Sequence, residues 1–153
     1  MRCPEHLQTL DITPDSPRMR AEVRPLFRAL RPALTDEAFE RFAVEAYGQG
    51  LVFTAAYGSS GTDGGACLAV ATHRTLATSR GRILHVDDLV TDAGRRSGGV
   101  GARLFDVLVG RARAAGCDGV ELDSGVTNVA AHRFYHARRM SIGALHFRLD
   151  VHA

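Results

Sequence analysis

The chain has 153 residues, of which 45% are hydrophobic and 24% charged, and this fits one globular domain spanning residues 1–153. Its formal net charge is only +2, so the charge balance gives no reason to expect a nucleic-acid partner. No apolar run approaches the ~20 residues that span a bilayer, and the three cysteines fit a reducing compartment. We therefore expect a cytoplasmic protein that has no membrane partner.

The first part of the chain predicts a strand followed by helices. Residues 7–13 alternate apolar and polar side chains, which is typical of an edge strand. Ser16 can cap a helix beginning at Pro17, and Pro25 within its apolar pattern predicts that this helix is kinked or split. Thr35 can cap a second helix.

Three strand candidates follow, in residues 51–57, 66–76 and 82–91. The eight residues GSSGTDGG at 58–65 predict a hairpin loop between the first two. The third candidate is unusual because a central strand here carries two adjacent carboxylates, Asp87 and Asp88.

The last third predicts a helix over residues 100–115, a strand over 119–124, a helix capped by Asn128 and a final strand over 142–151. The order is β-α-α-β-β-β-α-β-α-β. Hairpins come early and β-α-β crossovers late, so we expect an α+β fold around a mixed, mostly antiparallel sheet flanked by helices.

A glycine-rich basic stretch, GRRSGGVG at residues 94–101, precedes the helix at 100–115. Successive backbone N–H groups leading into a helix N-terminus bind anions. Glycine lets the backbone approach a phosphate closely, and Arg95 and Arg96 add positive charge. The stretch therefore predicts a ligand that carries phosphate.

Two familiar phosphate loops do not fit this stretch. A P-loop needs Gly-Lys-Ser/Thr, and the chain contains no lysine. A dinucleotide fingerprint starting at Gly99 needs a third glycine where Leu104 stands. What remains is Arg96-x-x-Gly99-x-Gly101, a short pattern that a flexible linker would also explain.

A second pattern, N-x-x-A-x-x-F-Y, opens the next predicted helix and ends at Tyr135. Alone, this pattern would also fit a capped helix whose aromatic side chain packs on the core. Together, RRSGGVG and NVAAHRFYHARRM resemble the GNAT superfamily of acyl-CoA-dependent N-acetyltransferases, matching its pyrophosphate loop, R/Q-x-x-G-x-G/A, and its N-x-x-A-x-x-F-Y helix. The resemblance covers nearly the whole chain. It implies a splayed sheet, acetyl-CoA as co-substrate and transfer of its acetyl group to a primary amine.

Further segments, VDDLVTD, ELDSGV and AHRFY, resemble one bacterial subgroup whose acceptors are little defined. That subgroup usually has arginine where this chain has Asn128 and proline where it has Ala93. The sequence contains no evident long acidic groove, so we expect a small-molecule amine as the acceptor. A homodimer is possible.

The resemblance also implies roles for individual residues. Backbone groups of Leu89, Val90 and Thr91 would run alongside the pantetheine arm. The pyrophosphate would lie against the backbone N–H groups of Arg96, Ser97, Gly98, Gly99, Val100, Gly101 and Ala102. Asn128 would contact the cofactor arm, and Tyr135 would face the thioester sulfur as the general acid.

The general base is open among His85, Asp87, Asp88 and water. An alkyl ammonium is mostly protonated at neutral pH and must lose a proton before it attacks. Strict strand alternation places His85 and Asp87 on one face and Asp88 on the other. Asp87 is favoured ahead of His85, although either acid could instead pair with an arginine. A strand N–H near Leu89 or Val90 could stabilise the oxyanion.

Two other interpretations compete with a small-molecule acetyltransferase. A non-catalytic acyl-CoA-binding module would keep the glycine loop, and a protein N-acetyltransferase would use the same donor. His132 and His136 lie four residues apart, but Arg133 occupies the glutamate position of an H-E-x-x-H site, so we expect no metal.

Overall fold

The structure is a computed structural model that describes residues 7–58 and 65–152. The chain divides into two compact units, Met1–Glu121 and Leu122–Ala153, and each is described by itself. The predicted hairpin loop at 58–65 falls mostly on residues 59–64, which lie outside the described residues.

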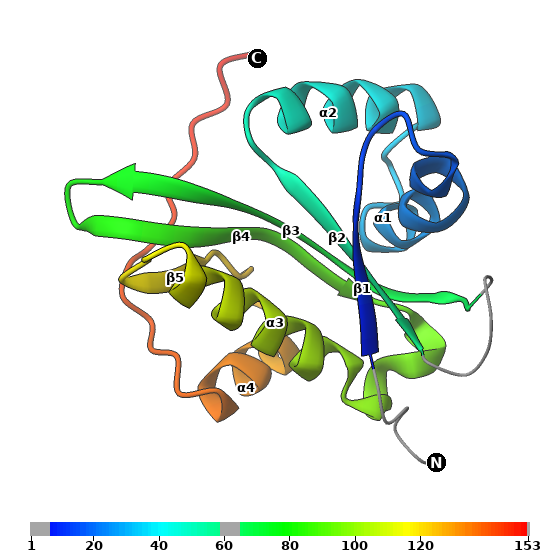
Figure 1. Ribbon diagram of the computed structural model, residues 1–153. Helices are drawn as coiled ribbons and strands as arrows, with labels where there is room; N and C mark the ends of the chain where they lie inside the picture. Colours follow the sequence, from blue (N-terminus) through cyan, green and yellow to red (C-terminus); the bar gives the residue numbers. More distant parts are fainter. Residues whose placement is uncertain (1–6, 59–64, 153) are drawn as a thin grey trace. The chain divides into compact units, whose positions relative to one another are not determined.

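A five-stranded sheet organises the first unit (Figure 1). Its strands, in spatial and chain order, are β1 (Leu7–Ile12), β2 (Val52–Gly58), β3 (Cys67–Thr78), β4 (Gly81–Thr91) and β5 (Gly119–Leu122). The pairs β1–β2, β2–β3 and β3–β4 are antiparallel. At the start of β5, the Asp118 N–H donates to the Arg82 carbonyl at 2.6 Å and its carboxylate accepts from the Arg82 N–H at 2.9 Å. The expected mixed, mostly antiparallel sheet with flanking helices is confirmed.

The sheet has helices on both faces (Figure 1). Phe53 of β2 packs 6.2 Å from the ring of Phe27 in α1 (Arg24–Leu30), and Phe27 packs 5.5 Å from Phe39 in α2 (Asp36–Gly48). The next residue, Thr54, bonds to Arg111 of α3 (Val100–Ala114). Because neighbouring strand residues point to opposite faces, α1 and α2 cover one face and α3 covers the other.

The helix predicted from Pro17 is split, as Pro25 indicated. A π-helix, η1 (Met19–Val23), runs directly into α1, with Pro25 in the first turn of α1. Proline has no N–H and its ring crowds the carbonyl four residues back, so a regular α-helix cannot continue through it. Ser16 Oγ accepts from the Arg18 N–H at 3.3 Å, and Thr35 caps α2 by accepting from the Ala38 N–H at 3.2 Å.

The second unit contains α4 (Val129–Ala137), and the prediction that Asn128 caps it is confirmed. The predicted strand over residues 142–151 is wrong, because this segment has no strand conformation. Its alternating apolar side chains, Leu145, Phe147, Leu149 and Val151, are 73 to 88% exposed. Alternation is typical of a strand, but a strand also needs a neighbouring backbone to pair with, and a sequence pattern cannot provide one.

Candidate active site

A β-bulge in β4 organises the candidate catalytic residues. Thr72 of β3 pairs with Asp88, while the next residue, His73, pairs with Val86, so Asp87 is the extra residue. The extra residue shifts by one position the alternation of β4 side chains between the two faces of the sheet. His85 and Asp88 lie opposite Arg74 and Thr72, which are two residues apart and share a face. The prediction that Asp88 lies on the face opposite His85 is therefore wrong.

Both carboxylates at the bulge have arginine partners. Arg74 of β3 binds Asp87 through two bonds, Nε to Oδ2 at 3.1 Å and Nη2 to Oδ1 at 2.9 Å. The bond to Asp87 raises the pKa of Arg74. Asp88 accepts from Arg31 Nη2 at 3.2 Å and from Thr72 Oγ1 at 3.2 Å. The sequence left open which acid would pair with an arginine, and in the structure both do.

The end of β4 meets the start of α3. Val90 is buried in the core under α1 and α2, and Leu89 and Thr91 are half-buried on either side of it. A Cβ at Gly101 would come within 3.1 Å of Thr91 Oγ1. A side chain at position 101 would therefore need Thr91 to shift by a few tenths of an ångström, and glycine lets the first turn of α3 lie this close to β4 without that shift.

The glycine-rich stretch between β4 and α3 forms a compact turn rather than an open loop. Residues Ala93–Gly98 form a 3-10 helix, η2, in which the Arg95 N–H donates to the Asp92 carbonyl at 2.9 Å. Asp92 also caps this turn through its side chain, which accepts from the Gly94 N–H at 3.0 Å. The donors in these two bonds, the N–H groups of Gly94 and Arg95, precede the backbone of residues 96–102 that the family resemblance assigns to the pyrophosphate.

Gly99 joins η2 to α3 in the left-handed conformation, with φ of 71°, and caps α3 without any side-chain bond. The first turn of an α-helix has N–H groups without intrahelical acceptors, so an anion can bind there. Arg95 and Arg96 are exposed beside this turn, whereas the Ser97 side chain lies outside the described part of the structure. A left-handed glycine, an uncapped helix start and adjacent arginines fit a phosphate group.

Asn128 and Tyr135 lie in the second unit. Asn128 Oδ1 accepts from the Ala131 N–H at 3.2 Å, which fixes the start of α4. Tyr135 lies one turn from the end of the same helix, with its ring 5.4 Å from that of Phe134. Burial raises the pKa of Tyr135, so its hydroxyl stays protonated through the neutral range.

The histidines of the second unit bind backbone or a carboxylate. His132 Nε2 lies 2.8 Å from the Gly125 carbonyl, His136 Nδ1 3.2 Å from the Met140 carbonyl, and His146 Nδ1 3.0 Å from Asp123. Among the described residues, no group of three or more histidine, cysteine or acidic side chains is arranged to hold a metal ion. Within the same residues, no helix combines the length and apolarity needed to cross a membrane.

A polar network beneath α3, in which Thr54 and His73 are buried, was not predicted from the sequence. Thr54 Oγ1 donates to Asp11 at 2.7 Å, and Arg111 Nη1 donates to Thr54 at 3.0 Å. His73 Nε2 lies 3.0 Å from the same hydroxyl. Because the hydroxyl proton is used on Asp11, His73 must donate its Nε2–H. Burial lowers the pKa of His73 to about 4, and the charge of Arg111 acts in the same direction.

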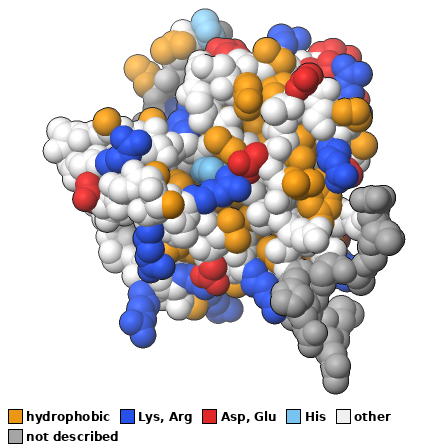
Figure 2. Space-filling view, viewed as in Figure 1, with side chains coloured by type: hydrophobic (Ala, Val, Ile, Leu, Met, Phe, Trp, Pro, Cys, Tyr) orange, Lys and Arg blue, Asp and Glu red, His pale blue; other side chains and the backbone are white. Residues whose placement is uncertain are grey.

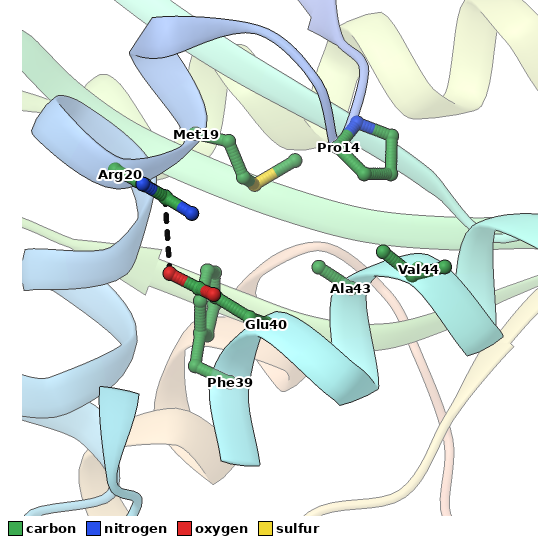
Figure 3. A pocket seen from close by; sticks show the side chains of 7 residues that line it. All are labelled: Pro14, Met19, Arg20, Phe39, Glu40, Ala43 and Val44. Atoms are coloured by element: carbon green, nitrogen blue, oxygen red, sulfur yellow. Dashed lines mark ion pairs between the residues drawn. The ribbon is translucent and has the colours of Figure 1, made fainter. Parts of the chain in front are cut away.

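A pocket lies between η1 and α2, away from these residues (Figure 3). Its lining is mostly apolar, from Met19, Phe39 and Ala43, and the ion pair from Arg20 Nε to Glu40 Oε1 at 3.0 Å crosses it. It contains none of the predicted site residues. On the face shown in Figure 2, arginine and carboxylate side chains of the described residues are interspersed with apolar ones.

Comparison with known proteins identifies a family match. The family model described as the acetyltransferase (GNAT) family matches residues 17–140. A comparison with curated proteins found no match.

Several solved structures share the fold. An aminoglycoside N-acetyltransferase, AAC(6')-Iy in complex with CoA, has a TM-score of 0.77 at 14% identity, covering 97% of this chain and 96% of that one. A tetramutant of the BH1408 protein of Bacillus halodurans has a TM-score of 0.76 at 20% identity, covering 94% of this chain and 99% of that one. Glucosamine-6-phosphate N-acetyltransferase of Arabidopsis thaliana has a TM-score of 0.70 at 22% identity, covering 96% and 99%. At these identities the likeness concerns the fold.

Proposed function

Because this chain belongs to the acetyltransferase (GNAT) family, we propose that it transfers the acetyl group of acetyl-CoA to a primary amine of a small molecule. The observation that carries the proposal is the glycine turn, where left-handed Gly99 opens α3 and Gly101 lies against Thr91. The family match runs across both units, which supports one acetyltransferase domain over residues 1–153. The motifs around β4, β5 and α4 support the bacterial subgroup. A cytoplasmic location and a homodimer stay predictions.

The donor would be held by two stretches of backbone. The first turn of α3, from Val100 to Ala102, and the turn at Arg96–Gly99 would bind the pyrophosphate, with helix N–H groups and arginine charge as the attractive forces. Leu89, Val90 and Thr91 would run alongside the pantetheine arm, and Asn128 would contact the arm from α4. Acetyl-CoA supplies an activated acetyl group as a thioester.

The base must come from the bulge of β4 or from water. Asp87 and His85 are the side chains we propose, with Asp87 first. Each oxygen of Asp87 already accepts a bond from Arg74, so accepting a proton would require that pair to loosen. His85 shares the face of Asp88 and has no such bidentate partner among the described contacts. A backbone N–H at Leu89 or Val90 would stabilise the developing oxyanion.

Tyr135 is the proposed general acid, donating its hydroxyl proton to the leaving thiolate. Its raised pKa keeps that proton in place at neutral pH. We expect Tyr135→Phe to lower turnover by roughly 10²–10⁴ in a thiol-release assay with acetyl-CoA, with CoA affinity retained in calorimetry. The control is Tyr47→Phe, which removes the same hydroxyl from the exposed surface of α2.

Unchanged turnover in Tyr135→Phe would remove this residue as the acid. CoA binding without thiol release from any amine would favour a non-catalytic acyl-CoA-binding module. Release only with a protein amine would favour a protein N-acetyltransferase. The aminoglycoside and glucosamine-6-phosphate acetyltransferases that share the fold support a small-molecule acceptor.

A further inference from the structure

The ion pair between Arg31 and Asp88 is half open to solvent. Arg31 Nη2 donates to Asp88 Oδ1 at 3.2 Å, and the Arg31 side chain is 63% exposed whereas that of Asp88 is 12% exposed. Only one nitrogen of the guanidinium is used in this contact, and a guanidinium offers five donors in a planar fork. Arg31 therefore retains donors that can bind a second carboxylate.

The position of this pair links it to the proposed reaction. Asp88 directly precedes Leu89, the residue from which the proposed donor-binding backbone of β4 begins, and follows the bulge at Asp87. Arg31 ends α1 and bonds across to β4. Thr72 Oγ1 holds the other oxygen of Asp88 at 3.2 Å, which fixes the carboxylate.

The charges at the bulge are balanced rather than acidic. Arg31 pairs with Asp88 and Arg74 pairs with Asp87, so the two guanidinium groups offset the two carboxylates. A polycationic acceptor requires acidic groups in excess, because each added ammonium needs a counter-charge when it leaves water. A balanced pair instead matches an acceptor that itself carries one charge of each sign.

We propose that Arg31 and Asp88 bind the acceptor, and that the acceptor is an α-amino acid. Its carboxylate lies on the open side of the Arg31 guanidinium, and its ammonium lies against Asp88. In an α-amino acid the two charged groups are attached to the same carbon, and Arg31 and Asp88 are in direct contact at 3.2 Å, so one small molecule can reach both side chains. This inference rests on the proposed acetyltransferase function and names its substrate class.

The test compares amino acids with their methyl esters, which keep the amine and lose the carboxylate charge. Thiol release from acetyl-CoA is measured for both series with the full chain and with Arg31→Gln. We expect the native protein to have a kcat/KM at least about 10-fold higher for the acids, as a charge-assisted bond implies. Arg31→Gln should lose this preference, so that its kcat/KM falls further for the acids than for the esters. The control, Arg80→Gln, removes an equally exposed arginine that pairs with Glu121.

The outcomes distinguish a failure of the proposed substrate class from a failure of the proposed acetyltransferase function. Turnover of esters, polyamines or aminoglycosides in preference to amino acids would overturn the inference and leave the acetyltransferase standing. An equal loss for acids and esters in Arg31→Gln would also overturn it. If no amine releases thiol, isothermal titration calorimetry of amino acids with the CoA-loaded protein tests the inference by binding alone. Binding that depends on Arg31 supports the inference, and no binding overturns it.

Discussion

Four of the described residues have a positive φ at helix ends, and three of them, Gly50, Gly99 and Gly116, are glycines. Gly99, with φ of 71°, precedes α3, and Arg139, with φ of 61°, follows α4. At Arg139 the chain forms a Schellman turn, in which the Arg139 N–H donates to the His136 carbonyl at 2.9 Å and the Met140 N–H donates to the Tyr135 carbonyl at 3.1 Å. Glycine adopts this conformation freely, whereas a side chain there costs roughly 1–2 kcal/mol.

Replacing Arg139 with glycine should therefore stabilise the protein. We expect Arg139→Gly to raise the free energy of unfolding by about 1 kcal/mol, measured by urea denaturation. The adjacent Arg138 has a φ of −93°, so Arg138→Gly relieves no strain and should not stabilise. Equal effects of the two substitutions would show that the conformation of Arg139 carries no energetic cost.

At the scale of elements, the sequence was informative where a local pattern determines the structure. Pro25 predicted the split helix, and Thr35 and Asn128 were identified as caps, because each acts on its own neighbours. The bulge at Asp87 could not be predicted, since it depends on how β3 and β4 pair. The partners of Asp87 and Asp88 were missed for the same reason. Arg31 lies 57 residues from Asp88 in the chain, and only the fold brings them together.

The network beneath α3 joins this helix to β1, β2 and β3 through the Thr54 hydroxyl, which contacts Asp11, Arg111 and His73. This histidine is neutral in the folded protein, because burial lowers its pKa to about 4 from an ordinary value near 6.5. Between these values the unfolded chain binds a proton that the folded protein does not. The contribution of His73 to stability is therefore fully present above pH 6.5 and is lost as the pH falls toward 4.

Replacing His73 with glutamine should remove this contribution, since a glutamine amide can donate to Thr54 without titrating. Between pH 7 and 4.5 the native protein should lose roughly 2–3 kcal/mol more than His73→Gln, as urea denaturation at each pH would measure. The control, His136→Gln, removes an exposed histidine and should follow the native curve. Parallel curves for all three proteins would contradict a buried neutral His73.

At the scale of the whole molecule, the proposed pyrophosphate turn and the proposed acceptor pair belong to different elements of the first unit. The residues of the glycine turn are adjacent in the sequence, so its motif could be recognised there. The match of the GNAT family model over residues 17–140 confirms the family that the motif indicated. The proposed acceptor pair combines α1 with β4 and has no motif. The final strand was predicted wrongly for the same reason. Apolar and polar side chains alternate in this segment, but the sequence does not show whether another strand pairs with it.

The central claim is that the turn at Gly99 anchors the pyrophosphate of acetyl-CoA. Isothermal titration calorimetry of the full chain with CoA, dephospho-CoA and pantetheine tests it most directly, because dephospho-CoA keeps the pyrophosphate without the 3'-phosphate, whereas pantetheine lacks the pyrophosphate and the adenosine attached to it. We predict that CoA and dephospho-CoA bind and that pantetheine binds at least about 10-fold more weakly than either, as the loss of charge-assisted bonds to a helix N-terminus implies. Equal affinity for dephospho-CoA and pantetheine, or no binding of CoA, would contradict the account.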